Sequence, residues 1–383
     1  MKQIIRTLIF GLFGIYAVQL NAQEQEHLAI DAQMNAAIEQ VVASDIPGVS
    51  VAIIGPEGLI WSGAAGYSMI EDQKQMSQSH LFGIGDITHH FLGAIIIQLE
   101  QEGFLSFDDT PVSILGEQFA NIENADKAKI KELLNHTSGI YSWDNDPDWA
   151  RRSRGIQLNP TYRWEKDEPL KYITSNKHAA TSVPGTSYQF SKSNYTLLGL
   201  IIEKVTGELL EDEMRSRILT PLDLNNTYYD TYEPVPLGLM AGSYHFGSDE
   251  FISRVGVNAK FDFEEGRLLA TTGTTLSAEG VGSGMVSTAR DLAKFAKAIW
   301  QDDFLAKDRS ILFSPVAARN KGIHSEILGF TSDVRQIENS DLIIVSLANL
   351  GAVQTGENDI RMFLDTYVEN ILIPVAKKYA SNN

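Results

Sequence analysis

The residues best suited to chemistry lie in the segment 82–91, which reads Phe-Gly-Ile-Gly-Asp-Ile-Thr-His-His-Phe. Asp86 and His89 are three residues apart, so a helix would place the carboxylate and the imidazole on one face. Such a pair suits acid–base chemistry, for example hydrolysis by an activated water or an elimination. A metal site would also need His90, which points elsewhere on a helix, so we expect no metal and no other cofactor.

A loop and a buried helix must position these two side chains. Gly83 and Gly85 allow a turn and close approach of the backbone, and Asp86 is a suitable N-cap. The apolar run 92–97 follows. Apolar residues recur with the spacing of a packed helical face at Ile87, Phe91, Ala94 and Ile95.

Composition narrows the classes of function. The chain has 383 residues, 43% hydrophobic and 21% charged, which predicts a globular protein with one large domain or a domain with an insertion. It has no cysteine, which excludes disulfides, thiol nucleophiles and cysteine-ligated zinc. The formal net charge of −18 argues against binding to nucleic acid, because phosphate backbones repel such a chain.

Residues 1–22 have the pattern of a secretory signal peptide. Lys2 and Arg6 form a charged start, residues 8–18 are apolar, and a cleavage site is expected after Ala22. The apolar run is too short for a confident membrane span. We therefore expect residues 23–383 to be released as a periplasmic or secreted bacterial protein that is not held in a membrane.

Three other segments have recognisable local patterns. Residues 49–54 and 59–63 predict a strand hairpin around the turn 56–58. The segment 184–195 reads Pro-Gly-Thr-Ser-Tyr-Gln-Phe-Ser-Lys-Ser-Asn-Tyr and leads into a helix. Near the end, the segment 322–332 reads Gly-Ile-His-Ser-Glu-Ile-Leu-Gly-Phe-Thr-Ser and predicts a strand and turn.

In their residues and in their order along the chain, these segments resemble the serine β-lactamase and penicillin-binding-protein superfamily. The resemblance is strongest to its class C β-lactamase, D-Ala-D-Ala carboxypeptidase and esterase branch. The resemblance covers about residues 28–379. It implies an α+β fold of the β-lactamase/transpeptidase type, with an antiparallel sheet flanked by helices. It also implies an all-helical subdomain and lid, inserted at roughly residues 86–220 of the domain 23–383.

At the positions where the resemblance implies catalytic residues, this chain has other residue types. Asp86 stands where the family has its nucleophilic serine and His89 where it has lysine. Phe190 and Lys192 stand at the family's tyrosine and asparagine. No serine in the chain is followed three residues later by lysine, so the nucleophile motif has not moved elsewhere.

The last-strand motif has two possible registers. Anchoring on Gly329 and Phe330 puts Ile323 at the family's His/Lys position and Ser325 and Glu326 at its glycine pair. A shift of one residue puts His324 there instead. In either register, Ile323, His324, Ser325 and Glu326 are the candidate ligand-binding residues.

Two residue types have structural interpretations. His136, in the loop 135–140, is expected to bond nearby backbone rather than to catalyse. Trp143, Trp149 and Trp164 could line a ring-binding wall, but a core of a small helical region is the simpler interpretation.

We consider two functions. The first is a catalytically degenerate, exported member of the family that keeps a groove for a small molecule, a peptidoglycan-like peptide or an acyl ligand. In that case Lys192 and His89 neutralise Asp86, since a buried charge must be paired, and Lys192 could favour a ligand carboxylate. The alternative is an active hydrolase or lyase acting on an ester, amide or peptide, in which Asp86, His89 and Lys192 converge with His324 or Glu326.

Overall fold

The structure is a computed structural model that describes residues 31–43, 46–230, 232–261, 268–302, 304–305, 322–353, 355 and 367–381. The expected signal segment, residues 1–22, lies outside these ranges. Among the described residues, no helix combines the length and apolar character needed to cross a membrane.

A six-stranded antiparallel sheet forms the centre of the molecule, with strand order β3-β2-β1-β11-β10-β9. The first and last parts of the chain therefore meet in one sheet, because β1 pairs with β11. The strands are β1 (Gly48–Gly55), β2 (Gly58–Met69), β3 (Lys74–Gln75), β9 (Gly322–Ile327), β10 (Phe330–Gln336) and β11 (Ile343–Ala348).

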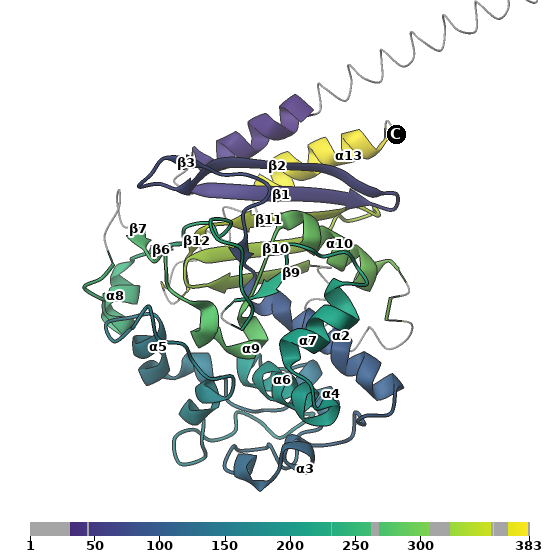
Figure 1. The fold of residues 1–383 in the computed structure, drawn as a ribbon, viewed down its shortest axis with the longest axis vertical. Coiled ribbons are helices and arrows are strands. Elements are labelled where there is room, and N and C mark those ends of the chain that lie inside the picture. The colour runs from purple at the N-terminus through teal and green to yellow at the C-terminus, as the bar shows by residue number, and fades with distance from the viewer. Residues whose placement is uncertain are drawn as a thin grey trace, which may run out of the picture.

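Helices cover both faces of this sheet (Figure 1). On one face, the helical residues 31–42 and α13 (Ile373–Ser381) pack on apolar side chains of β1 and β11. On the other face lies α10 (Ala289–Trp300), followed by a mainly helical region that contains α2 (Thr88–Gln101). The α+β fold with an antiparallel sheet between helices, expected from the sequence, is confirmed.

The mainly helical region is built around α2 and α6 (Lys192–Thr206), which pack on each other. Its other helices are α3 (Pro111–Leu115), α4 (Ile130–Leu134), α5 (Pro147–Ser153), α7 (Leu210–Met214), α8 (Asp249–Val255) and α9 (Gly280–Ser283). Two three-stranded sheets complete the fold. One is β4 (Phe82–Gly83), β8 (Met285–Ser287) and β5 (Tyr228–Tyr229), and the other is β12 (Leu350–Gly351), β6 (Tyr244–Phe246) and β7 (Leu268–Ala270).

Several local expectations are confirmed. The hairpin is present as β1 and β2, although β2 extends to Met69. Trp143, Trp149 and Trp164 are core residues, all at most 3% exposed. Packing on one another and on neighbouring rings, they do not form an open ring-binding wall.

Candidate functional site

Four segments that are distant in sequence meet at Asp86. They are the short 3-10 helix η1 (Gly85–Ile87) before α2, the start of α6, the consecutive helices η6 (Leu276–Glu279) and α9, and the strand β9. Gly85 has φ +50°, and a Cβ there would lie 2.2 Å from Ser325 Oγ. The turn therefore needs glycine so that β9 can approach the backbone at Asp86.

Asp86 does not cap α2, which corrects the sequence-based expectation. It lies inside η1, and the residue at the N-cap of α2 is Ile87, which makes no side-chain capping bond. Instead, Asp86 Oδ1 accepts a 2.6 Å hydrogen bond from Ser283 Oγ and lies 3.1 Å from Lys192 Nζ. Only 16% of the Asp86 side chain is exposed.

Lys192 lies between two carboxylates. Its Nζ is 3.1 Å from Asp86 Oδ1 and 3.2 Å from Glu279 Oε2. Glu279 in turn accepts hydrogen bonds from both Nε and Nη2 of Arg154 at 2.7–3.2 Å. The four side chains form a line of alternating charge, and Lys192, Glu279 and Arg154 are each at most 3% exposed.

These contacts hold the inner groups in their charged forms. Burial by itself would lower the pKa of Lys192, but the carboxylates of Asp86 and Glu279 outweigh it and raise that pKa above its ordinary value. Burial would raise the pKa of Glu279, but Arg154 and Lys192 hold it below its ordinary value. The ammonium of Lys192 is therefore already neutralised inside the protein, which argues against its recruiting a ligand carboxylate.

Sequence reasoning missed Glu279, Arg154 and Ser283. A buried lysine requires a counter-charge, but Asp86 was already expected to supply it, so nothing in the sequence pointed to a second acid near Lys192. Glu279 is 87 residues from Lys192 along the chain and Arg154 is 125 residues from Glu279, so no local pattern links them.

His89 lies beside Asp86 as expected, but it is not hydrogen-bonded to it. Its Nε2 is 3.8 Å from Asp86 Oδ1 and makes no hydrogen bond in the described part of the chain. The ring stacks on Tyr195 with centroids 3.9 Å apart. Burial, with nearby His136 and Lys192, lowers the pKa of His89 well below its ordinary value, so the imidazole is neutral.

Phe190 forms the outer wall of this centre. It is 41% exposed, and its ring stacks on His136 at 4.7 Å and lies 5.7 Å from His89. His136 has the structural role expected of it, because its Nδ1 accepts the backbone N–H of Ser191 at 3.2 Å. Tyr195 does not supply the hydroxyl that Phe190 lacks, since its O–H donates to the Leu134 carbonyl at 2.8 Å.

The β9 residues divide between the two faces of the strand. Ser325 faces Asp86 and accepts the Asp86 backbone N–H on its Oγ at 2.7 Å. Ile323 lies two residues earlier, on the same face, and packs against the main core. Ser325 thus occupies the backbone donor at the residue where the family resemblance implies a nucleophile.

His324 and Glu326 do not converge with Asp86, which corrects the alternative that grouped them. Strand alternation turns both toward the opposite face, where His324 Nε2 lies 3.0 Å from Glu326 Oε1 and Nδ1 lies 3.6 Å from Asp333 Oδ2. Arg335 pairs with the same Asp333 at 2.6 Å. The acid–base residues brought together at η1 are therefore Asp86, His89 and Lys192, with Glu279.

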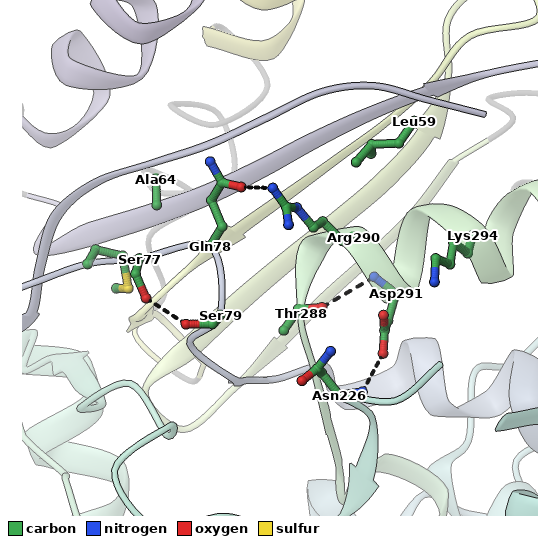
Figure 2. A pocket seen from close by; sticks show the side chains of 11 residues that line it. Leu59, Ala64, Ser77, Gln78, Ser79, Asn226, Thr288, Arg290, Asp291 and Lys294 are labelled. Carbon is green, nitrogen blue, oxygen red and sulfur yellow. Dashed lines mark hydrogen bonds between the residues drawn. The ribbon is translucent and has the colours of Figure 1, made fainter. Parts of the chain in front are cut away.

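Metal binding has no support among the described residues, where no group of three His, Cys, Asp or Glu side chains is arranged to hold an ion. A groove of about 700 Å³ is present, but it lies elsewhere, between β2 and the start of α10 (Figure 2). None of the residues around Asp86 lines it.

Comparison with known proteins agrees with the fold. The family model described as beta-lactamase matches residues 34–323 of this chain. Penicillin-binding protein 4* of Bacillus subtilis is 25% identical over 280 residues, which cover 70% of this chain and 56% of that protein. Protein flp of Staphylococcus aureus strain MW2 is 28% identical over 185 residues, which cover 48% of this chain and 35% of that protein. The chain thus spans little more than half of the first relative and about a third of the second.

Solved structures show the same fold at lower sequence identity. D-amino acid amidase from Ochrobactrum anthropi SV3, complexed with L-phenylalanine amide, superposes with a TM-score of 0.74 at 22% identity. The match covers 92% of this chain and 99% of the amidase. The octameric penicillin-binding protein homologue from Pyrococcus abyssi superposes with a TM-score of 0.64 at 21% identity, covering 92% of this chain and 77% of that one.

Proposed function

Because the chain belongs to the beta-lactamase family of serine hydrolases, we propose that it is an exported member that no longer forms an acyl-enzyme and instead binds a ligand. The observation that carries this proposal is the state of Asp86. Its carboxylate is paired with Lys192, and its backbone N–H donates to Ser325 Oγ. Both the nucleophile and an oxyanion donor of acyl transfer are thereby missing.

Chemical reasoning supports the loss of acyl transfer. Attack by a carboxylate on an amide would form an anhydride and expel a much poorer leaving group, and the pairing with Lys192 and Ser283 makes Asp86 a weaker nucleophile still. Phe190 has no proton to pass to a leaving group, and Ile323 has no charge with which to hold a substrate.

The ligand proposed is of the kind the family handles: a peptidoglycan-like peptide, a β-lactam-like acyl compound or a small ester. The charged start and apolar run of residues 1–22 support export to the periplasm or medium. Near the surface of the site, Phe190 is 41% exposed and the Asp86 side chain 16%, so both could contact a ligand.

One observation favours a second candidate, an active hydrolase or lyase that does not use serine. His89 is neutral, its Nε2 makes no hydrogen bond within the described residues, and it lies 3.8 Å from Asp86. A neutral imidazole with a free nitrogen can accept a proton from water.

The test is turnover of a chromogenic cephalosporin and a p-nitrophenyl ester by the purified protein, beside Asp86→Ala and His89→Ala. Asp148→Ala serves as the matched control, since that carboxylate is 73% exposed. We expect no turnover above a heat-killed sample, no mass increase with penicillin, and a raised melting temperature with one of the ligand classes. Turnover that Asp86→Ala and His89→Ala abolish, and Asp148→Ala leaves unchanged, would establish the second candidate instead.

A further inference from the structure

The groove between β2 and α10 has the size of a small-molecule site. Its volume is about 700 Å³, within the range typical of pockets that enclose drug-sized ligands. Figure 2 shows it between β2, the segment 76–79 and the start of α10. Its lining combines an apolar part, formed by Leu59, Ala64 and Met76, with a polar part.

Arg290 is the distinctive polar group of this lining. Its Nε donates to Ser62 Oγ at 2.7 Å and its Nη2 to Gln78 Oε1, and both acceptors are neutral. A guanidinium has five N–H donors, so most of its donor capacity is still uncommitted. Within the described ranges no carboxylate pairs with Arg290, although the chain as a whole has a net charge of −18.

The other charges of the groove are already compensated. Asp291 Oδ2 accepts the backbone N–H of Asn226 at 2.7 Å and the hydroxyl of Thr227 at 3.2 Å. Lys294 lies 3.3 Å from Asp223 Oδ2 and also donates to the Asp223 carbonyl. Lys294 thus has a carboxylate partner and Asp291 is held by neutral donors, whereas in the described part of the chain no carboxylate lies beside the guanidinium of Arg290.

Arg290 is also held in place. Gln78 Nε2 donates to the Ser62 carbonyl at 2.8 Å, and Ser62 Oγ donates to Gln78 Oε1 at 2.8 Å. Together with the bonds of Arg290, they connect β2, the segment 76–79 and α10 around the guanidinium. Figure 2 shows the bond between Gln78 and Arg290. Ser77 and Ser79 add hydroxyl groups on the same side of the groove. A fixed guanidinium loses less entropy when it binds a planar anion than a free one does.

We propose that this groove binds a small organic carboxylate, with the carboxylate on Arg290 and the apolar body against Ala64 and Met76. The planar fork of arginine matches a carboxylate, and the neighbouring apolar wall suits a carbon skeleton better than a bare inorganic ion. This groove is separate from Asp86, so the proposal does not depend on whether the protein forms an acyl-enzyme.

The experiment is calorimetric titration of the full-length protein with three probes that share a phenyl group. They are 4-phenylbutyrate, its neutral analogue 4-phenylbutyramide, and phenyl phosphate. We expect 4-phenylbutyrate to bind with a dissociation constant of about 1 mM or below, and the amide to bind at least about tenfold more weakly. Raised salt should weaken binding of the carboxylate and leave the amide unchanged.

Variants of Arg290 locate the binding. Arg290→Gln should weaken binding of 4-phenylbutyrate about tenfold, and Arg290→Lys, which keeps the charge but loses the fork, should weaken it by less. Arg254→Gln is the matched control, because Arg254 is exposed and pairs with Glu250 on α8. Asp86→Ala should also bind normally.

Three results would overturn the proposal. They are no saturable binding of 4-phenylbutyrate, equal affinity for the amide, or unchanged affinity in a folded Arg290→Gln protein. Tighter binding of phenyl phosphate than of 4-phenylbutyrate would replace the carboxylate with a phosphate ligand.

Discussion

His89 and His324 each lie beside carboxylates, yet they are held in opposite protonation states. His89 Nε2 is 3.8 Å from Asp86, and the pKa of His89 is well below its ordinary value. His324 Nε2 is 3.0 Å from Glu326, and the pKa of His324 is raised to about 9. The two sites lie on opposite faces of the strand β9.

The number of carboxylates beside each histidine, and the cations near them, explain the difference. Burial opposes charge on both histidines, but Asp86 is already neutralised by Lys192, whose ammonium also repels a proton on His89. His324 has two carboxylates, Glu326 and Asp333, which together outweigh its burial. His324 is therefore charged because two carboxylates contact it, although Asp333 also pairs with Arg335. His89 has the single carboxylate of Asp86 beside it, and Lys192 already pairs with that group.

The largest expected effect is that of Lys192→Met. It would leave Asp86 and Glu279 without the ammonium between them, so we expect a loss of about 3–5 kcal/mol in the free energy of unfolding. Urea denaturation measures this loss. Lys294→Met, at a partly exposed lysine paired with Asp223, is the control and should cost less than about 1 kcal/mol. Equal losses in the two variants would show that Lys192 is not the centre of the charge line.

The second-largest effect is expected on the free energy of unfolding at alkaline pH. Burial would lower the pKa of His324, but Asp333 and Glu326 raise it to about 9 in the folded protein. The stabilisation is thus fully present below pH 6.5 and is lost as the pH rises through 9, by about 3 kcal/mol in all. His324→Gln should remove this alkaline decline in urea titrations. Glu326→Gln should move the decline to lower pH, and an unchanged decline in either variant would contradict the assignment.

The Asp86 face should respond in the opposite direction. Burial lowers the pKa of His136 to about 4, so the neutral ring contributes stability above pH 6.5 that is lost as the pH falls toward 4. This contribution should decrease by about 2 kcal/mol between pH 7 and pH 5. His136→Asn suits the test because asparagine tolerates the φ of +58° at this position. If the stability of His136→Asn still fell with decreasing pH as steeply as that of the unmodified protein, His136 would not be the source of this decline.

The sequence predicted the frame better than the site, for physical reasons. Alternation, turn residues and the 3.6-residue period are local signals, and they gave the hairpin β1–β2, the helix after Asp86 and the core tryptophans. The pairing of Asp86 with Lys192 was also expected, because a buried charge needs a partner.

What could not be predicted depends on register and on tertiary contacts. The turn η1 delays the start of α2 past Asp86, which removes the expected cap. The pairing of β9 with β10 decides that Ser325, rather than Glu326, faces Asp86. The Arg154–Glu279 pair joins residues 125 apart in the chain, a contact that no local pattern specifies.

A smaller effect should follow from Ser325→Ala. The Asp86 N–H would lose its 2.7 Å hydrogen bond, which we expect to cost about 1 kcal/mol in the free energy of unfolding. Hydrogen exchange at the Asp86 amide should become faster, while amides of β1 keep their rates. Ser340→Ala, in a turn between β10 and β11, is the control for loss of a serine hydroxyl. Unchanged exchange at Asp86 would mean that Ser325 does not occupy this donor.

The smallest effect is expected of Asp86→Ser, which should not restore acylation. In this variant the backbone N–H of residue 86 would still donate to Ser325 Oγ, so it could not stabilise an oxyanion. Loss of one oxyanion donor lowers the rate of acyl transfer by a factor of about 10²–10³. Phe190 would still offer no proton to a leaving group. Intact mass after incubation with penicillin should therefore show no adduct. The double variant Asp86→Ser with Ser325→Gly frees the backbone N–H of residue 86 and so tests this donor separately. Acylation of Asp86→Ser alone would show that the bond from this N–H to Ser325 is not what prevents acyl transfer.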